Sequence, residues 1–447
     1  MSYAKPITPT PPGTATPRTL LPFSNTQSVE PPVVHFAKRD FIYDWVCSTH
    51  VIRAASPRES PAVKTSAVLT TKPLPVESTK AERQAAVDMK YARIMEQRTA
   101  IAAGAEVAPD ETPMWITVNR YAPALVPSNS PGATLIVAHA TGFHKEIWDT
   151  TFRFILSTLR RNARTSDIAE IWAIDAANHG DSALLNEGKL GDVYEWSDHT
   201  RDIANFIINY LPESPIECKG NLLPLVTKSV SLQRMSNGFS SRTVIGLGHS
   251  FGGCTLMRAA LHLPHLFSGV ILIDPIIYPT YARREEGVGK LTKGALGRRD
   301  RWPDVNAAKS GLLNSPFFQA WHPDVFSDYM KYGLYESEGM VKLKCSGYQE
   351  GVTFAEHGRL PNEVWEMLPS FDERIPLRWL MDSKAALSTA GEEITQHTVW
   401  RRPKNSSNAR IQGAGHLIPQ EAPERLAHEI VDFIQQIVDA RGIKPRL

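Results

Sequence analysis

Residues 242–256 read Arg-Thr-Val-Ile-Gly-Leu-Gly-His-Ser-Phe-Gly-Gly-Cys-Thr-Leu, and this stretch decides the fold. Apolar, β-branched residues lead into Gly248-His-Ser-Phe-Gly252, and a run compatible with a helix, Cys254 to His262, follows. The two glycines leave room for a turn that is too tight for side chains on either side of Ser250. A helix that starts after the turn aims backbone N–H groups at negative charge forming near the hydroxyl. Strand, sharp turn and helix are the setting of a nucleophile elbow, so the stretch predicts that Ser250 is a nucleophile.

Nearly unbroken apolar runs, typical of buried parallel strands, alternate with helical patterns along the chain. We expect strands in 41–52 and at 114–118, 133–138, 168–174, 243–247, 269–273 and 376–381, with a last strand at 399–400 or 409–411. We expect helices at 148–162, 196–210 and 422–439. This alternation predicts an α/β fold with a mostly parallel, doubly wound sheet. Such sheets bind ligands at the carboxyl ends of their strands, where Ser250 and several other polar residues lie.

Composition divides the chain into a core, insertions and two ends. The first 32 residues are rich in Pro and Thr and hold few large apolar residues, so we expect them to be disordered. The long segment before the strand at 376–381 is rich in aromatic residues, and we expect it to form a lid over the pocket. The predicted parts are a disordered start (1–32), a core (33–274 and 372–441) with insertions near 81–103 and 211–241, a lid (275–371) and a tail (442–447). We expect the first insertion to form a helix and the second to be polar and poorly packed.

The bulk composition excludes several classes of protein. The chain has 447 residues, and its formal net charge of +2 argues against a general nucleic-acid-binding protein. Its 4 cysteines are scattered without a C-x-x-C pair, which indicates a reducing compartment and no zinc site. No apolar run approaches the roughly 20 residues that span a bilayer, and the start lacks a secretory pattern. We therefore expect a soluble intracellular protein with no integral membrane segment, no metal and no organic cofactor.

A serine hydroxyl is a weak nucleophile at neutral pH and needs a base within hydrogen-bond reach. His416 is the best placed of the 14 histidines, because it lies in a glycine-rich loop (413–419) before the final helix. A base in this place completes the chain order Ser, acid, His. His139 and His179 compete, but both precede the serine and are expected to shape loops at the sheet edge. His249 lies inside the turn and is expected to point away from the site.

The base in turn needs an acid that holds its tautomer and stabilises its cation. Two aspartates, Asp274 and Asp382, lie between Ser250 and His416, and each ends or follows a predicted strand. The position of Asp382 is the commoner one for this chain order, and Asp274 reaches the same space from the neighbouring strand. The residues alone leave this choice open.

The negative charge that forms on an attacked carbonyl needs two preorganised donors. One is the backbone N–H of Phe251, directly after the nucleophile. The other is expected from the loop after the strand at 133–138, from Thr141 or Ala140. Because only backbone amides act, the identity of the side chains matters little here.

Three blocks carry a resemblance; they read His139-Ala-Thr-Gly-Phe-His-Lys-Glu146, Asp175-Ala-Ala-Asn-His-Gly-Asp-Ser-Ala-Leu-Leu-Asn186 and Gly248-His-Ser-Phe-Gly-Gly253. They are similar to the fungal peroxisomal α/β-hydrolases, a group that includes toxin-biosynthesis hydrolases of the AK-toxin type, the mycophenolate-pathway acyl-CoA hydrolase and a yeast peroxisomal lipase. Phrases of the expected lid, such as Val341-Lys-Leu-Lys-Cys345, are similar too. The likeness runs from about Val33 to Arg441, and Asn178-His-Gly-Asp-Ser182 is its most specific part.

The resemblance implies an α/β-hydrolase fold with a helical lid insertion and a catalytic set of Ser250, Asp274 and His416. It favours Asp274 over Asp382, because the acid of the acyl-CoA hydrolase in that group follows the strand after the elbow. One departure is Ala140, which replaces the glycine usual after the histidine. This change leaves the assignment of Thr141 as oxyanion donor less firmly supported than that of Phe251.

Two further features bear on location and ligand. The last residues, Pro445, Arg446 and Leu447, resemble a degenerate peroxisomal address that an import receptor would bind, with a cytoplasmic location as the alternative. Seven basic residues stand near the start of the expected lid: Arg283, Arg284, Lys290, Lys293, Arg298, Arg299 and Arg301. They form either a solvated face or a landing site for the phosphates of coenzyme A.

These observations predict a serine hydrolase that cleaves a small-molecule acyl thioester or ester, similar to an acyl-CoA hydrolase, and the resemblance implies a role in fungal secondary metabolism. A lipase or carboxylesterase with the same catalytic residues is the first alternative. A catalytically silent binding protein that keeps the pocket is the second.

Overall fold

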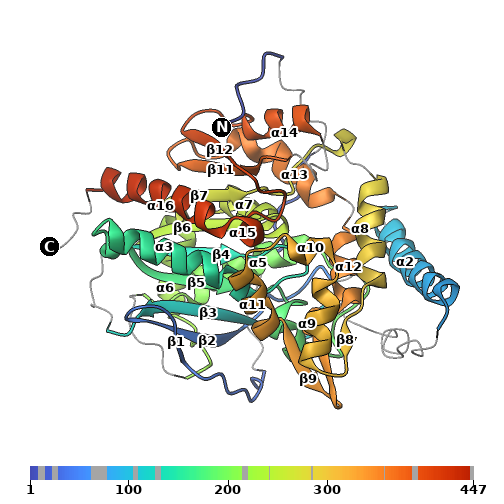
Figure 1. The fold of residues 1–447 in the computed structure, drawn as a ribbon. Coiled ribbons are helices and arrows are strands. Elements are labelled where there is room, and N and C mark those ends of the chain that lie inside the picture. Colours follow the sequence, from blue (N-terminus) through green and yellow to red (C-terminus); the bar gives the residue numbers. More distant parts are fainter. Residues whose placement is uncertain are drawn as a thin grey trace.

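The computed structural model describes residues 1–8, 16–22, 29–61, 78–103, 109–125, 132–213, 220–240, 242–282, 285–356, 358–384 and 391–442. Within these ranges nine strands form one central sheet in the order β1-β2-β3-β5-β4-β6-β7-β11-β12 (Figure 1). The strands are β1 (Arg39–Asp40), β2 (Trp45–Arg53), β3 (Trp115–Pro123), β4 (Ala133–Ala138), β5 (Ile168–Ile174), β6 (Thr243–His249), β7 (Gly269–Ile273), β11 (Leu377–Asp382) and β12 (Ser406–Ile411). In this order, every pair of neighbours from β5 to β12 is parallel. The β1–β2, β2–β3 and β3–β5 pairs are antiparallel. The predicted mostly parallel sheet is confirmed.

The central strands bury both faces, because successive side chains of a strand point to opposite sides. In β4, Leu135 and Val137 belong to the apolar core on one face, and Ile136 belongs to the core on the other. Helices α3 (Asp149–Arg161) and α16 (Pro423–Ala440) cover the first face (Figure 1). Helices α5 (Trp196–Asn205), with its π-helical continuation Phe206–Tyr210, and α7 (Phe251–His262) cover the second. Two helical layers around one sheet confirm the doubly wound architecture.

The parallel strands bring several polar residues to one edge of the sheet. His139 follows β4, Asp175 follows β5, Ser250 follows β6 and Asp274 follows β7, while Asp382 ends β11. In the order β5-β4-β6-β7-β11 these strands are successive neighbours, so their carboxyl ends form one row. A ligand site in a sheet of this kind lies along such a row.

The insertion between β7 and β11, residues 275–371, lies beside this edge (Figure 1). A small antiparallel sheet in the order β8-β10-β9, which the sequence did not predict, joins its helices. Trp302, Trp321 and Tyr329 are buried in the same apolar core as residues of β4, α3 and α16, whereas Phe317 is 48% exposed, so the insertion packs on the main domain. Its elements are α8 (Glu285–Gly297), β8 (Arg301–Trp302), α9 (Val305–Leu313), α10 (Pro316–Gln319), α11 (Pro323–Tyr332), β9 (Leu334–Ser337), β10 (Met340–Leu343), α12 (Gly347–Phe354) and α13 (Arg359–Met367).

The expectation of a disordered N-terminus is wrong for residues 1–8 and 16–22, while 9–15 and 23–28 lie outside the described residues. Tyr3 is buried, and its carbonyl accepts a hydrogen bond of 2.9 Å from the Trp400 indole. The Arg18 side chain forms an ion pair of 2.6 Å with Glu363. The segment is anchored because a few large or charged side chains find partners in the folded domain, a signal that average composition does not contain.

The structure contains helices in both predicted insertions and fixes the position of the last strand. The helix expected at 81–103 is present as α2 (Lys80–Ala102), which packs on α8. The segment 211–241, expected to be polar and poorly packed, contains α6 (Lys228–Asn237), and Leu211, Leu223 and Arg234 are buried; residues 214–219 and 241 lie outside the described ranges. The last strand is β12, which agrees with the second of the two alternatives. The remaining helices are α4 (Gly180–Leu185), α14 (Glu392–Val399) and α15 (Ile418–Glu421).

None of the helices in the described ranges is both long enough and apolar enough to span a bilayer.

Candidate active site

Ser250 occupies the turn between β6 and α7 with φ 56° and ψ −118°, a conformation that L-residues rarely adopt. Strain of this kind costs of order 1–3 kcal/mol and persists only where the surroundings hold it. The Ser250 N–H donates to the carbonyl of Ile273 on β7 at 3.0 Å, and the Ser250 carbonyl accepts from Ile276 N–H at 3.2 Å. The neighbouring strand and the segment after it therefore hold the turn.

The glycines of the turn are required by close approaches of the backbone. A Cβ atom on Gly252 would lie 2.5 Å from the carbonyl oxygen of His139, and one on Gly248 would lie 2.5 Å from the carbonyl oxygen of Gly252. Both distances are far shorter than real contacts. The reason that we gave for these glycines, a turn without room for side chains, is confirmed.

Ser250, His416 and Asp274 form one hydrogen-bonded chain although they are far apart in the sequence. Nε2 of His416 lies 2.9 Å from Oγ of Ser250, and Nδ1 of His416 lies 2.5 Å from Oδ2 of Asp274. Ser250 is 6% exposed, and the side chains of His416 and Asp274 are 14% and 13% exposed. The group is thus almost enclosed but not sealed.

The environment of His416 favours its protonated form. Burial of the ring opposes a positive charge, but the hydrogen bond and the charge of Asp274 outweigh burial and raise the pKa of His416 above 6.5. Asp382, the alternative acid, is 3% exposed and adds a smaller electrostatic contribution in the same direction. The carboxylate that bonds to Nδ1 of His416 is that of Asp274.

We expected His249 to point away from the site, but its side chain lies beside His416. Its Nε2 lies 2.8 Å from the carbonyl oxygen of His416, and the two rings are 5.3 Å apart. Burial, together with the charge of His416, holds the pKa of His249 well below its usual value. Neutral His249 therefore donates its Nε2–H to the loop that carries His416 and holds that loop against the turn.

The predicted oxyanion donors lie on two elements that meet at the turn. Phe251 is the first residue of α7, so its amide is among those without an acceptor inside the helix. Thr141 lies in the loop after β4, and Gly252 of α7 approaches the backbone of that loop at His139. The start of α7 and the loop after β4, which carry the two predicted donors, are thus in contact.

His139 and His179 form hydrogen bonds with the loop after β4, which agrees with the prediction that they shape loops at the sheet edge. Nε2 of His139 accepts from Ala176 N–H at 3.0 Å, and its Nδ1 lies 2.8 Å from the Ala140 carbonyl. Nε2 of His179 accepts from Gly142 N–H at 2.9 Å. Both rings are buried, and burial lowers the pKa of each.

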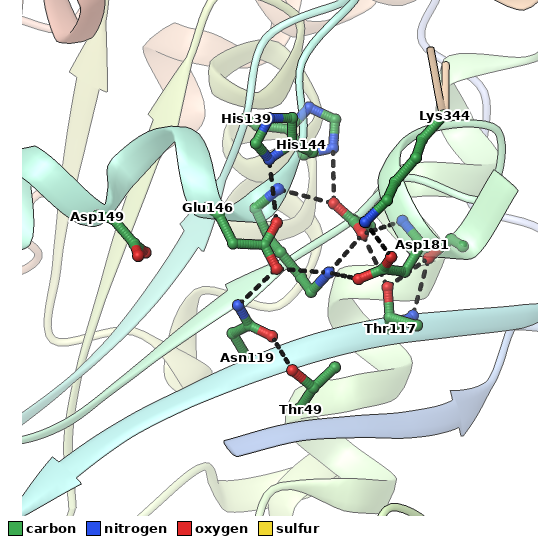
Figure 2. Close-up of polar contacts among 12 residues, drawn as sticks. Thr49, Thr117, Asn119, His139, His144, Glu146, Asp149, Asp181 and Lys344 are labelled. Atoms are coloured by element: carbon green, nitrogen blue, oxygen red, sulfur yellow. Dashed lines mark hydrogen bonds and ion pairs between the residues drawn. The ribbon is translucent and has the colours of Figure 1, made fainter. Parts of the chain in front are cut away.

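A buried network of charges, which the sequence analysis did not recognise, follows the same loop (Figure 2). Nζ of Lys145 lies 3.0 Å from Asp175, 2.5 Å from Asp181 and 2.9 Å from Glu146. Burial opposes the charge of Lys145, but these carboxylates outweigh it and hold its pKa well above the usual value. The only signal in the sequence is that these residues fall within the blocks His139–Glu146 and Asp175–Asn186. We call Lys145, Glu146, Asp175 and Asp181 the Lys145 network.

The basic residues near the start of the insertion are mostly neutralised. Four of them form ion pairs with acidic side chains, in the pairs Lys290–Glu286, Lys293–Asp88, Arg298–Glu350 and Arg301–Asp300. Arg299 donates to the carbonyl of Arg301. Arg283 and Arg284 lie outside the described residues. Across the described ranges, no group of His, Cys, Asp and Glu side chains is arranged to hold a metal ion.

Comparison with known proteins agrees with this fold. A family model described as "Alpha/beta hydrolase family" matches residues 135–429, which include every strand from β4 to β12 except the first two residues of β4. The peroxisomal alpha-beta-hydrolase Lpx1 of Saccharomyces cerevisiae superposes with a TM-score of 0.59 over 90% of this chain and 92% of that chain. At 17% identity this likeness concerns the fold alone.

Two curated relatives come from fungi. The chain is 28% identical to the type I acyl-CoA thioesterase mpaH of Penicillium roqueforti over 226 residues, which are 50% of this chain and 45% of that protein. It is 26% identical to the abhydrolase domain-containing protein AFT2-1 of Alternaria alternata over 43% of this chain and 83% of that protein. The match therefore spans less than half the length of the thioesterase. The resemblance found in the sequence blocks is confirmed.

Proposed function

The chain belongs to the alpha/beta hydrolase family, and from the site described above we propose that it is a serine hydrolase that cleaves an acyl thioester or ester. The observation that carries the proposal is the hydrogen-bonded chain from Ser250 through His416 to Asp274, with distances of 2.9 and 2.5 Å. In this proposal the insertion 275–371 is the lid of the site. Among the relatives named above, the type I acyl-CoA thioesterase supports an acyl-CoA substrate.

The proposed reaction has two acyl-transfer steps. Oγ of Ser250 attacks the carbonyl carbon while Nε2 of His416 takes its proton, and the amides of Phe251 and Thr141 stabilise the oxyanion. The intermediate collapses, and the thiol or alcohol leaves with the proton from His416. Water then attacks the acyl-enzyme with His416 as base, and the carboxylic acid departs from regenerated Ser250. Asp274 stabilises the imidazolium in both steps without becoming protonated.

Acyl-CoA and a simple oxygen ester remain the two substrate classes to separate. The acidic partners of Lys290, Lys293, Arg298 and Arg301 weaken the idea of a phosphate-binding patch, because little unpaired positive charge is left among these four. This observation favours a lipase or carboxylesterase as the second candidate. Residues 445–447 lie outside the described ranges; peroxisomal import through them is part of the proposal, and a tagged C-terminal fragment that stays diffuse in cells would remove it.

The first test is activity-based labelling together with a substrate panel. A fluorophosphonate probe is expected to label the folded protein at Ser250, and Ser250→Ala is expected to abolish labelling and lower kcat by roughly 10⁶-fold. Rates on acyl-CoA, p-nitrophenyl esters and glyceryl esters then rank the substrate classes. Ser157→Ala is the matched control, because the Ser157 hydroxyl bonds to Tyr43 at the surface. Folded protein without labelling, and with no effect of Ser250→Ala, would leave only a binding function.

A further inference from the structure

The Lys145 network connects the loop that carries Thr141 with the insertion. Oδ2 of Asp181 lies 2.5 Å from Nζ of Lys145, which belongs to the loop side. Oδ1 of the same carboxylate lies 2.6 Å from Nζ of Lys344, which follows β10 of the insertion (Figure 2). One buried carboxylate is therefore shared between a lysine of the core and a lysine of the insertion.

Lys145 fixes the end of the loop through both its backbone and its side chain. Its N–H donates to Oδ1 of Asp175 at 2.7 Å, and its Nζ donates to Oδ2 of Asp175 at 3.0 Å. Asp175 in turn accepts from the Thr117 hydroxyl at 2.8 Å and from the Asp181 N–H at 3.0 Å. The position of Lys145, and with it that of the loop back to Thr141, thus depends on the carboxylates around its ammonium group.

Glu146 extends the network under the same loop. Its Oε1 lies 2.8 Å from Nδ2 of Asn119 on β3, and its Oε2 lies 3.0 Å from Nδ1 of His144 (Figure 2). Burial works against its ionisation, but the charge of Lys145 and the contact with His144 hold the pKa of Glu146 well below its usual range. Glu146 and Asp175 are buried and Asp181 is largely so, and carboxylates in such places need a partner charge.

The insertion also contacts the loop directly. Glu350 of α12 packs so closely on Gly142 that a Cβ atom there would lie 2.5 Å from Oε1 of Glu350. Asn178, in the most specific of the sequence blocks, donates to the hydroxyl of Thr353 on α12 at 2.9 Å. The insertion thus rests on the loop at Gly142 and on the network at Asp181.

Loss of the Lys344 charge would leave Lys145 as the one cation bonded to Asp181 among the described residues. The ammonium of Lys145 would then be drawn toward Asp181 and away from Asp175, which also binds the Lys145 backbone. A displacement of that backbone moves the amide of Thr141, and the stabilisation of an oxyanion depends on donors held near 2.7–3.1 Å from it.

We propose that Lys344 is a positioning residue: docked on Asp181, it sets, through Lys145, the position of the loop amide that stabilises the oxyanion. The inference rests on the proposed hydrolase function and extends it, because it makes the efficiency of the reaction depend on a contact of the insertion. Within the part of the chain that the structure describes, Lys344 forms no hydrogen bond or ion pair with Ser250 or His416, so its effect passes through Asp181 and Lys145.

The test compares an oxygen ester with its thiono counterpart, in which sulfur replaces the carbonyl oxygen. Sulfur accepts hydrogen bonds poorly, so the ratio of kcat/KM for the two substrates measures the contribution of the oxyanion donors. In Lys344→Gln we expect kcat/KM on the oxygen ester to fall by about tenfold, less than the roughly 10²–10³ for loss of a whole donor. The rate on the thiono ester should change little, so the ratio should fall as well.

The matched control is Lys342→Gln, two residues before Lys344 and in β10, since Lys342 pairs with Glu338 inside the insertion at 2.6 Å and, among the described residues, forms no ion pair with the core. Lys342→Gln should keep the wild-type ratio of kcat/KM for the two esters. Lys344→Arg, which keeps the positive charge, should have most of the wild-type ratio. If Lys344→Gln does not fold, Asp181→Asn, which keeps the size and removes the shared charge, should lower the same ratio.

A lower rate with an unchanged ratio, or equal behaviour of the two glutamine variants, would overturn the inference. Its failure is separable from failure of the proposed function, because the latter would appear as wild-type protein without Ser250-dependent hydrolysis.

Discussion

The Ser250–His416–Asp274 chain and the Lys145 network lie along the same edge of the sheet, and both are built from hydrogen-bonded ionisable groups, but their electrostatics differ. The first contains one carboxylate and an imidazole, and the hydrogen bond and charge of that carboxylate raise the pKa of the imidazole above 6.5. The second holds Lys145 with its pKa well above, and Glu146 and Asp181 with theirs below, the usual values. Groups shifted in these directions stay ionised throughout the neutral range.

This difference separates two tasks. In the proposed reaction a proton moves between Ser250 and His416, whose side chains are in direct hydrogen-bond contact. In the second group Lys145, with its raised pKa, holds three carboxylates at 2.5–3.0 Å, an arrangement that fixes geometry and offers no proton transfer. Charge at a sheet edge can therefore serve chemistry or position, and the pattern of partners distinguishes the two. The comparison predicts that variants of the first group mainly affect turnover, and that variants of the second affect stability and, to a smaller degree, kcat/KM through the loop of Thr141.

The largest expected effect is on turnover in Asp274→Asn. An amide in place of the carboxylate favours the wrong tautomer of His416, and we expect kcat to fall by about 10⁴-fold with little change in the free energy of unfolding. Steady-state kinetics on the best substrate of the panel measure this change. Asp382→Asn is the matched control and should reduce kcat far less; the reverse ranking would assign the acid to Asp382.

The next effect concerns stability. Lys145→Met removes the cation that three carboxylates share, two of them buried, and we expect a loss of about 3–5 kcal/mol in the free energy of unfolding. Urea unfolding at neutral pH measures this loss. Lys342→Met, which breaks an ion pair to the 82% exposed Glu338, should leave the free energy of unfolding nearly unchanged.

The pH dependence of stability tests whether the loss in Lys145→Met comes from charge. Carboxylates with lowered pKa values contribute stability above their unfolded pKa, and this contribution is lost as the pH falls through the folded value. The difference in the free energy of unfolding between wild type and Lys145→Met should therefore be largest at neutral pH. It should become smaller as the pH falls below the ordinary pKa values of 4.5 for Glu146 and 3.8 for Asp181. A difference that stays constant down to acid pH would mean that packing, not charge, explains the loss.

The smallest effect lies in the pH profile of kcat/KM. Activity needs neutral His416, so the rate should decline on the acid side with a midpoint above 6.5, the ordinary value. Asp382→Asn removes a minor contribution that raises the pKa of His416, so this midpoint should move to slightly lower pH while most of the turnover remains. A midpoint that does not move, or that rises, would contradict the influence of Asp382.

Local signals in the sequence predicted the strands and helices that frame the site. The turn around Ser250 was readable because its backbone needs glycine at Gly248 and Gly252, and apolar runs marked β4, β5 and β7. The prediction of a disordered N-terminus failed in its described parts, because it relied on average composition, whereas Tyr3 is buried through individual contacts. In residues 211–241 most described side chains are exposed, as expected of a poorly packed segment, and Arg234 is an exception because it donates to the carbonyls of Ile207 and Ile208.

The Lys145 network could not be predicted from the residues, because no spacing rule relates Lys145 to Asp175, Asp181 and Lys344. Their meeting depends on β4 and β5 being neighbours and on β10 returning to the core from the insertion. His249 illustrates the same limit at short range. The turn that carries it was predicted, but its contact with the His416 carbonyl depends on a loop more than a hundred residues away.

The sequence by itself determined the doubly wound sheet, the strained turn at Ser250 and a short set of partners for it, since backbone requirements and apolar periodicity are written in consecutive residues. Only the tertiary structure decided that the carboxylate bonded to His416 belongs to Asp274, and that one carboxylate joins the insertion to the loop of Thr141. The physical reason is that hydrogen bonds and ion pairs act over a few ångströms, and distances on that scale exist only after distant segments have packed.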